Sequence, residues 1–283
     1  MPIQVNGSPA GGAHLGLIPW TPDPVAIQLG PIPIAWYGIG YALGLAAAYL
    51  VMTREARRRG LDVRVVDNGI IVVTVAGLVG GRIYHVIDQW DYYSDHLTAI
   101  VTPPYRGLGV LGGIITATLA LAVLLRRWQQ SFWAWADVVA PGAFLMQAFA
   151  RWGNFFNQEL YGPPTGLPWG VAIDCEHRVA QWPCSTHPEA TTGFAPLFLY
   201  ESISGVLGAI TLLVIARRWG GRLRSGELFL VWLIWYAVVR IALESLRVNV
   251  WTTGGVPTAT LVAGALGLGA LGVLVGRRLA ARG

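Results

Sequence analysis

The sequence predicts an all-α, polytopic integral membrane protein with seven transmembrane helices, and three observations support this prediction. Hydrophobic residues make up 54% of the chain and charged residues only 12%, which is typical of membrane proteins rather than soluble enzymes. Apolar runs of about 20 residues, the length that crosses a hydrocarbon core, recur along the chain. All 20 basic residues are arginines, and most lie in short clusters between these runs. The net charge of +5 therefore indicates anionic lipid headgroups as partners and no nucleic acid.

Seven apolar runs define the expected helices. We expect them at 32–52, 68–87, 107–125, 134–150, 197–216, 228–246 and 256–275. Together they predict a single membrane-embedded domain over residues 1–283, with a long loop at 152–196. Residues 1–30 have no basic region before their first apolar run, so this segment does not read as a cleaved signal peptide.

The arginine clusters predict the orientation of the helices. Fourteen of the 20 arginines follow the first, third, fifth and seventh runs, and all of these connections lie on one side of the membrane. By the positive-inside rule this side is cytoplasmic, so the N-terminus and the loop at 152–196 lie outside and the C-terminus inside. The charged residues within the runs then gather in the outer half of the membrane, where their high cost predicts a functional site. They are Arg82, Arg151, Glu201, Arg240 and Glu244.

The sixth run carries three charged residues at helical spacing. Arg240, Glu244 and Arg247 stand at i, i+4 and i+7 and so share one face of a helix. They either neutralise one another as a structural link between helices or belong to a site. Further ionisable residues at the same depth favour the site.

The densest polar stretch is 151–162, at the outer end of the fourth run. The planar guanidinium of Arg151 suits a phosphate, and the carboxamides of Asn154 and Asn157 can hold hydroxyls or carbonyls. A lone arginine at a helix end is more typical of a snorkelling anchor. With Glu159 beside it as well, the stretch predicts a cradle for a lipid headgroup.

The external loop contains the two cysteines, Cys175 and Cys184. An oxidising environment favours a disulfide between them, with free thiols as the alternative. His177 and His187 lie nearby, but their spacing fits no standard zinc site, so we expect no metal.

The stretch 151–162 resembles the signature of the prolipoprotein diacylglyceryl transferase family, Gly-Arg-x-x-Asn-Phe-x-Asn-x-Glu-x-x-Gly. The resemblance extends over roughly residues 31–250. Any one of the other matching motifs is weak evidence, but their order along seven apolar runs makes the set specific. They are Trp36-Tyr37-Gly38, Gly80-Gly81-Arg82, the glycines at 107, 109, 112 and 113, Asp137 with Ala140-Pro141, Leu199-Tyr200-Glu201, and Arg240 with Glu244 and Arg247.

The resemblance implies an enzyme of the bacterial cytoplasmic membrane. It would transfer the diacylglyceryl group of phosphatidylglycerol to the lipobox cysteine thiol of a preprolipoprotein, forming a thioether and releasing glycerol 1-phosphate. Its partners would be phosphatidylglycerol and preprolipoprotein signal peptides, with no cofactor, and we expect a monomer. The substrate supplies the nucleophile, so the enzyme needs no cysteine or serine motif.

Residue roles follow from the chemistry of this transfer. A leaving phosphate ester needs arginines in a site shielded from water, and we expect Arg151 and Arg240 in this role. Four residues are candidates for proton transfer: Tyr37, Glu201, Glu244 and His85. The two glutamates could instead orient the arginines. The remaining substrate-binding candidates are Asn154, Asn157, Glu159, Arg82, Arg247 and His85.

Three positions depart from the family pattern. Ala150 replaces the glycine that begins the signature, which is a change between two small residues. Leu111 and Ala195 stand where many members carry histidine, so a histidine mechanism does not transfer to this chain. His85 is open to two interpretations, a base or an interfacial hydrogen-bonding residue. We interpret Asp137 as a packing or capping residue.

Other classes of membrane protein fit less well. A retinal protein needs a lysine, and an intramembrane serine protease of the Gly-x-Ser-x-Gly type needs that motif; the chain has neither. A lipid or solute transporter with an outward-facing charged cavity is the main alternative. A transporter would be expected to have two related halves and charged residues across the whole membrane, whereas the charges of this chain are expected mainly in the outer half. A scaffold would not need Arg, Asn and Glu together in one apolar chain.

Overall fold

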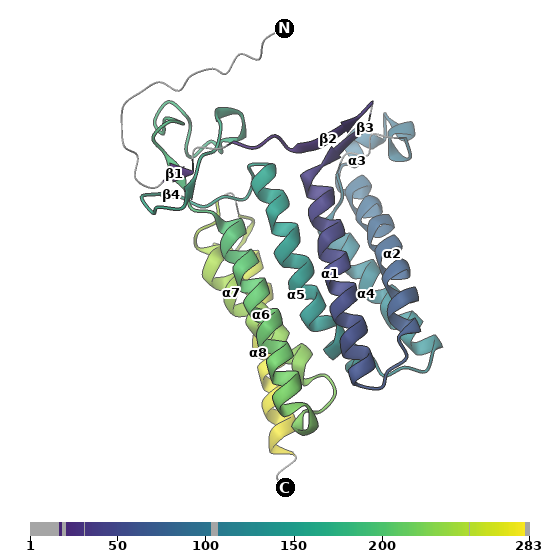
Figure 1. Ribbon diagram of the computed structural model, residues 1–283. Coiled ribbons are helices and arrows are strands. Elements are labelled where there is room, and N and C mark those ends of the chain that lie inside the picture. Colours follow the sequence, from purple (N-terminus) through teal and green to yellow (C-terminus); the bar gives the residue numbers. More distant parts are fainter. Residues whose placement is uncertain (1–16, 19–20, 31, 103–106, 249, 281–283) are drawn as a thin grey trace. The chain divides into compact units, whose positions relative to one another are not determined.

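The computed structural model is mainly helical (Figure 1). It describes residues 17–18, 21–30, 32–102, 107–248 and 250–280, so the expectation for the first 16 residues lies outside the described part. Within these ranges seven helices have 18 residues or more, and each corresponds to one of the seven apolar runs. They are α1 Trp36–Arg58, α2 Arg64–Asp88, α4 Val110–Arg127, α5 Phe132–Phe156, α6 Leu197–Trp219, α7 Glu227–Glu244 and α8 Thr258–Leu279.

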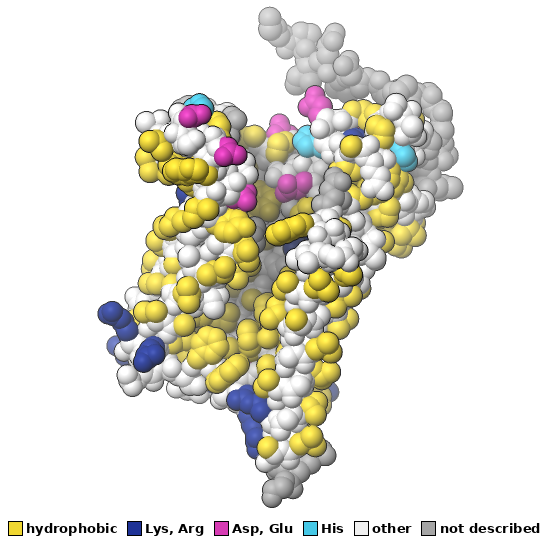
Figure 2. All heavy atoms as spheres, turned by 180° about the vertical axis from the view of Figure 1, so that it is seen from behind, with side chains coloured by type: hydrophobic (Ala, Val, Ile, Leu, Met, Phe, Trp, Pro, Cys, Tyr) yellow, Lys and Arg dark blue, Asp and Glu magenta, His cyan; other side chains and the backbone are white. Residues whose placement is uncertain are grey.

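Four helical segments of the described chain are long and apolar enough to cross a membrane. They are Trp36–Arg58, Arg64–Asp88, Leu197–Arg222 and Thr258–Leu279. Many hydrophobic side chains lie on the face shown in Figure 2. Ile71, Val75 and Leu78 of α2 are each more than half exposed. Such exposure would be costly in water and is expected in contact with lipid.

The remaining elements are short. The helical turns are α3 Trp90–Tyr93, η1 Leu97–Ile100, η2 Cys175–His177 and η3 Gly220–Arg222. The strands are β1 Leu17–Ile18, β2 Val25–Leu29, β3 Ile32–Ala35, β4 Pro164–Thr165, β5 Gly170–Val171, β6 Gly193–Phe194, β7 Thr252–Thr253 and β8 Val256–Pro257. They pair into a four-stranded sheet of order β1-β5-β6-β4 and the two hairpins β2-β3 and β7-β8.

Most helix boundaries differ by some residues from those expected, and three of the differences have a clear physical cause or consequence. The first helix does not begin at residue 32, because β3 pairs antiparallel with β2; Pro33 has no amide hydrogen and restricts the preceding residue to extended backbone. The third begins at Val110 rather than at Gly107, whose φ of +80° is left-handed. The fourth continues to Phe156 rather than ending at residue 150, and this extension places Arg151 and Asn154 one turn apart on α5.

The chain divides into two compact units. The first comprises Met1–Leu43, Gln147–Gly205 and Tyr236–Gly267, and the second Gly44–Met146, Val206–Trp235 and Leu268–Gly283. The expectation of a single membrane domain stays a prediction. The core of the first unit lies in the loop after α5, where Tyr161, Trp182, Phe194 and Phe198 pack together.

In the second unit α2 and α4 lie side by side (Figure 1). Glycines permit their close approach: a Cβ atom at Gly80 would overlap Thr116, and one at Gly112 would overlap Tyr84. The Thr116 hydroxyl donates to the Ala76 carbonyl of the facing helix at 2.8 Å. Small residues and such hydrogen bonds are typical of helix packing in membranes.

The start of α7 depends on Asp137 of α5, which is 2% exposed. Its Oδ2 accepts a hydrogen bond from the amide of Gly226 at 2.9 Å, and its Oδ1 accepts one from the amide of Phe229 at 3.0 Å. Arg59 Nη1 lies 3.4 Å from the same carboxylate. Asp137 therefore caps unpaired amides at a helix N-terminus, and its interpretation as a packing or capping residue is confirmed.

The loop between α5 and α6 is held by a disulfide and a polar cluster. Cys175 and Cys184 are bonded, with their Cα atoms 5.7 Å apart, so the expected pairing is confirmed. Asp174 Oδ2 accepts a hydrogen bond from Gln158 Nε2 at 2.7 Å, and Asp174 Oδ1 lies 2.6 Å from His177 Nδ1. Burial by itself raises the pKa of Asp174, but the hydrogen bonds from His177 and Gln158 outweigh it and lower this pKa below its ordinary value.

A pH effect on loop stability follows from this shift. Because the folded-state pKa of Asp174 is lowered, its ionised form stabilises the loop above the unfolded pKa of about 3.9. That stability is lost as the pH falls below this value. We expect Asp174→Asn to be less stable at pH 6 and to lose less protection between pH 6 and pH 3 than the wild type. Hydrogen exchange of residues 158–178 measures this, with Asp91→Asn as an exposed control; an equal loss in wild type and Asp174→Asn would contradict it.

Candidate active site

A continuous network of ion pairs joins three arginines and two buried glutamates of the first unit. Arg151 Nε of α5 lies 2.5 Å from Glu201 Oε2 of α6. The other oxygen of Glu201 accepts from Arg247, which follows α7. Arg247 Nε lies 3.7 Å from Glu244 Oε2, and the same oxygen lies 2.9 Å from Arg240 Nη2. Segments up to 96 residues apart in sequence thus meet in one polar cluster.

The network extends along the signature stretch. Arg151 Nη1 donates to Asn154 Oδ1 at 3.2 Å, and Asn154 Nδ2 donates to Glu159 Oε1 at 2.8 Å. Asn154 is 2% exposed, so its carboxamide is fixed between the two charged groups. The side chain of Asn157 takes no part in these hydrogen bonds within the described structure. Its backbone N–H donates to the Gly153 carbonyl at 2.9 Å.

Local backbone geometry explains how these side chains meet. On α5, Arg151 and Asn154 are three residues apart and therefore neighbours on the helix surface. At the other end of the network α7 ends at Glu244, and the amide of Arg247 donates to the Glu244 carbonyl at 3.1 Å. This final turn brings Arg247 back beside Glu244, as the spacing predicted.

The network retains capacity to bind an anion. Three guanidinium groups share the two buried carboxylates Glu201 and Glu244, so the buried part of the network has an excess of positive charge; the third carboxylate, Glu159, is exposed. Arg240 has one ion-pair partner among the described residues, Glu244, whereas a guanidinium carries five N–H donors. Oriented guanidinium groups with donors to spare are suited to phosphate.

Tyr37 packs directly against the signature stretch. A Cβ atom at Gly153 would overlap the Tyr37 ring, so glycine at this position permits the ring to lie on the α5 backbone. Tyr37 also stacks on Tyr41 with ring centroids 5.3 Å apart, and Trp36 stacks on Phe156 at 4.7 Å. The start of α1 is thereby fixed beside the segment that carries Arg151 and Asn154.

Arg82 and His85 belong to the second unit, and the ion-pair network consists of residues of the first. Arg82 donates from Nη2 to the Ala99 carbonyl at 2.7 Å and from Nε to the Ile100 carbonyl at 3.2 Å. The His85 ring lies edge-on to Tyr93 at 5.9 Å. Arg82 thus holds the segment after α3, whereas His85 contacts α3 itself. Their expected roles in substrate binding stay predictions.

Two features of this region escaped the sequence reasoning. The pair between Arg247 and Glu201 links positions 46 residues apart, and no sequence pattern connects them. Gln158, which is 4% exposed, joins the signature stretch to the rest of the loop between α5 and α6 through Asp174. Its position inside the signature, beside Asn157 and Glu159, was the only feature of the sequence that could have indicated this role.

The fold and the site define a class: a membrane-embedded protein with a buried, arginine-rich polar centre. The chain belongs to the prolipoprotein diacylglyceryl transferase family, whose family model matches residues 24–276. It is therefore an enzyme, a transferase of lipoprotein biosynthesis.

Three curated relatives illustrate the similarity, and each is named phosphatidylglycerol–prolipoprotein diacylglyceryl transferase. The protein of Listeria innocua is 35% identical over 91% of this chain and 90% of its own length. That of Symbiobacterium thermophilum is 39% identical over 87% and 89%. That of Chloroflexus aggregans is 37% identical over 80% and 76%. All three names support the transferase prediction, and none supports the alternative of a transporter.

Proposed function

We propose that this enzyme transfers the diacylglyceryl group of phosphatidylglycerol to the lipobox cysteine thiol of a preprolipoprotein. The thiol sulfur attacks the glyceryl carbon that carries the phosphate, a carbon–sulfur bond forms, and the carbon–oxygen bond to phosphate breaks. The products are a thioether-linked lipoprotein and glycerol 1-phosphate, and the thiol proton passes to a base. The single observation that carries the proposal is the arginine–glutamate network in a chain of this family.

The arginines would act on the leaving group. Negative charge builds up on the phosphate oxygen as the carbon–oxygen bond breaks, and preoriented donors in a site shielded from water stabilise it. Arg240 supports this role because it has donors beyond its pair with Glu244. Arg151 supports it because Glu201 and Asn154 fix its guanidinium plane. Both arginines would also raise the thiolate fraction of a nearby substrate thiol.

The glutamates would position these arginines rather than act on the substrate. Glu201 is 5% exposed and lies between Arg151 and Arg247, and Glu244 is 4% exposed and lies between Arg240 and Arg247. A buried carboxylate between two guanidinium groups fixes the orientation of both. Tyr37 is a candidate for proton transfer in this proposal. The remaining substrate-binding positions are Asn154, Asn157, Glu159, Arg82, Arg247 and His85.

The membrane arrangement belongs to the same proposal. Seven helices would cross the bacterial cytoplasmic membrane, with the N-terminus outside and the C-terminus in the cytoplasm. The basic residues in the last turns support it: Arg57 and Arg58 end α1, Arg126 and Arg127 end α4, and Arg217 and Arg218 end α6. This orientation would place the arginine–glutamate network in the outer leaflet, where lipoprotein precursors emerge.

Purified protein, phosphatidylglycerol and a synthetic lipobox peptide provide the direct test. We expect the mass of the peptide to increase by a diacylglyceryl group attached to its cysteine, with release of glycerol phosphate. A peptide with serine in place of that cysteine is the matched control, because its hydroxyl is far less acidic than a thiol. An unmodified cysteine peptide in the presence of folded, lipid-reconstituted protein would reject the proposal.

A further inference from the structure

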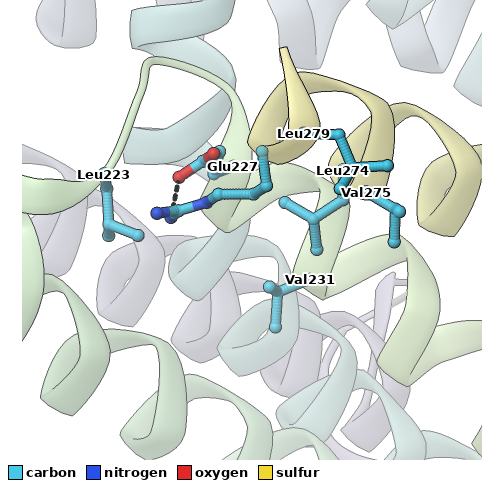
Figure 3. Close-up of a pocket in the computed structure, with 7 residues that line it drawn as sticks. Leu223, Glu227, Val231, Leu274, Val275 and Leu279 are labelled. Atoms are coloured by element: carbon cyan, nitrogen blue, oxygen red, sulfur yellow. Dashed lines mark hydrogen bonds and ion pairs between the residues drawn. The ribbon is translucent and has the colours of Figure 1, made fainter. Parts of the chain in front are cut away.

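Apolar and charged side chains line a common pocket in the second unit, where α7 begins and α8 ends (Figure 3). A pocket of about 390 Å³ is lined there by Val231 of α7 and by Leu274, Val275 and Leu279 of α8. The lining also includes Leu223 and two charged residues, Glu227 and Arg278, which form an ion pair. None of these residues belongs to the arginine–glutamate network.

Basic residues surround this pocket in excess. Arg278 Nη1 donates to the Arg222 carbonyl at 3.4 Å, and Arg224 Nη1 donates to the Arg277 carbonyl at 2.9 Å. The segments that carry these four arginines therefore lie close together, and the buried carboxylate of Glu227 pairs with one of them, Arg278. Arg222 is exposed, and the Arg278 side chain remains 46% exposed. Their surplus positive charge is available to an anion.

One carboxylate oxygen of Glu227 accepts no hydrogen bond within the described structure. The side chain is 1% exposed, and its Oε2 pairs with Arg278 and accepts from the Arg224 amide at 3.1 Å. A glutamate in the first turn of a helix is favourable in itself, which explains the ion pair. It does not explain Oε1, which is buried without a hydrogen-bond donor in the described structure. A donor supplied by a ligand in the adjoining pocket would satisfy it.

The membrane supplies a ligand with this combination of chemistry. Thr258–Leu279 is one of the membrane-length segments, and the pocket occupies its last turns, at the depth of the lipid headgroups. We infer that the pocket binds one anionic phospholipid of this leaflet. An acyl chain lies along Val231, Leu274 and Val275, the phosphate contacts Arg222 and Arg278, and a headgroup hydroxyl donates to Glu227 Oε1.

Photocrosslinking locates such a lipid without relying on enzyme activity. The full-length protein is placed in nanodiscs that contain a phosphatidylglycerol probe with a photoreactive acyl chain, and crosslinked peptides are mapped by mass spectrometry. We expect crosslinks in residues 223–231 and 274–279, at least several-fold stronger than with a phosphatidylcholine probe of the same chains. Because the map is site-resolved, phosphatidylglycerol bound elsewhere as substrate does not interfere.

Two variants test the pocket by independent routes. Arg222→Gln removes an exposed charge without unpairing Glu227, and Leu274→Trp fills the pocket without changing its charge. We expect each to reduce the crosslinks several-fold, whereas Arg126→Gln, an exposed arginine at the end of α4, leaves them unchanged. Equal labelling by the two probes, or unchanged labelling in both variants, would overturn the inference.

Discussion

Replacing Arg151 with alanine is expected to reduce diacylglyceryl transfer by about 10²- to 10³-fold, the usual cost of losing one donor to a developing anion. The substitution removes the guanidinium that Glu201 and Asn154 hold in place. The same loss is expected for Arg240→Ala. The measurement is the initial rate of thioether formation on a lipobox peptide in phosphatidylglycerol vesicles.

Controls separate lost chemistry from lost folding in this experiment. Removing Arg151 leaves the buried Glu201 with Arg247 as its remaining partner, and unpairing a buried charge costs about 3–5 kcal/mol. Thermal unfolding of each variant must therefore be measured alongside its rate. Arg151→Lys retains the charge without the planar fork and should recover part of the rate. Arg64→Ala, whose exposed pair with Asp62 lies outside the network, should keep all of it. Full activity in both Arg151→Ala and Arg240→Ala would refute their assignment to the leaving phosphate.

The second large effect concerns stability: Asp137→Ala is expected to destabilise the protein by about 3 kcal/mol or more. Two amides at the start of α7 lose their acceptor, and Arg59 loses the carboxylate beside it. Each buried polar group left without a partner costs about 1–3 kcal/mol. The midpoint of thermal unfolding in detergent should fall by several degrees.

Two comparison variants show whether the loss of stability comes from the lost cap. Asp137→Asn keeps one acceptor oxygen and should fall between wild type and alanine. Asp62→Ala removes a solvent-exposed ion pair with Arg64, which is worth at most about 1 kcal/mol. If Asp137→Ala were no less stable than Asp62→Ala, the capping role would be wrong.

The sequence was most informative where local pattern and local structure coincide. Seven apolar runs became seven long helices, and the spacing of Arg240, Glu244 and Arg247 placed them together because helical periodicity depends only on neighbouring residues. The disulfide also followed from the sequence, because two cysteines nine residues apart had no other partner.

Helix boundaries were harder to predict because tertiary contacts decide them. The first run was apolar from residue 32, yet its first four residues pair as a strand with β2. The fourth run seemed to end where polar residues begin, but α5 continues through Arg151 and Asn154. These polar side chains have partners, because Arg151 donates to Asn154 and pairs with Glu201. The hydropathy of the sequence therefore predicted an end to this helix that is too early.

The sequence by itself determined the helical class, the family and the residue types of the site, because hydropathy, spacing and motif order are properties of the linear chain. Only the tertiary structure decided which charges pair. Glu201 joins Arg151 to Arg247, and Asp137 caps α7, because a buried charge takes whichever opposite charge or amide the packed helices bring within reach. That choice depends on distances between segments far apart in sequence, and no local pattern encodes it.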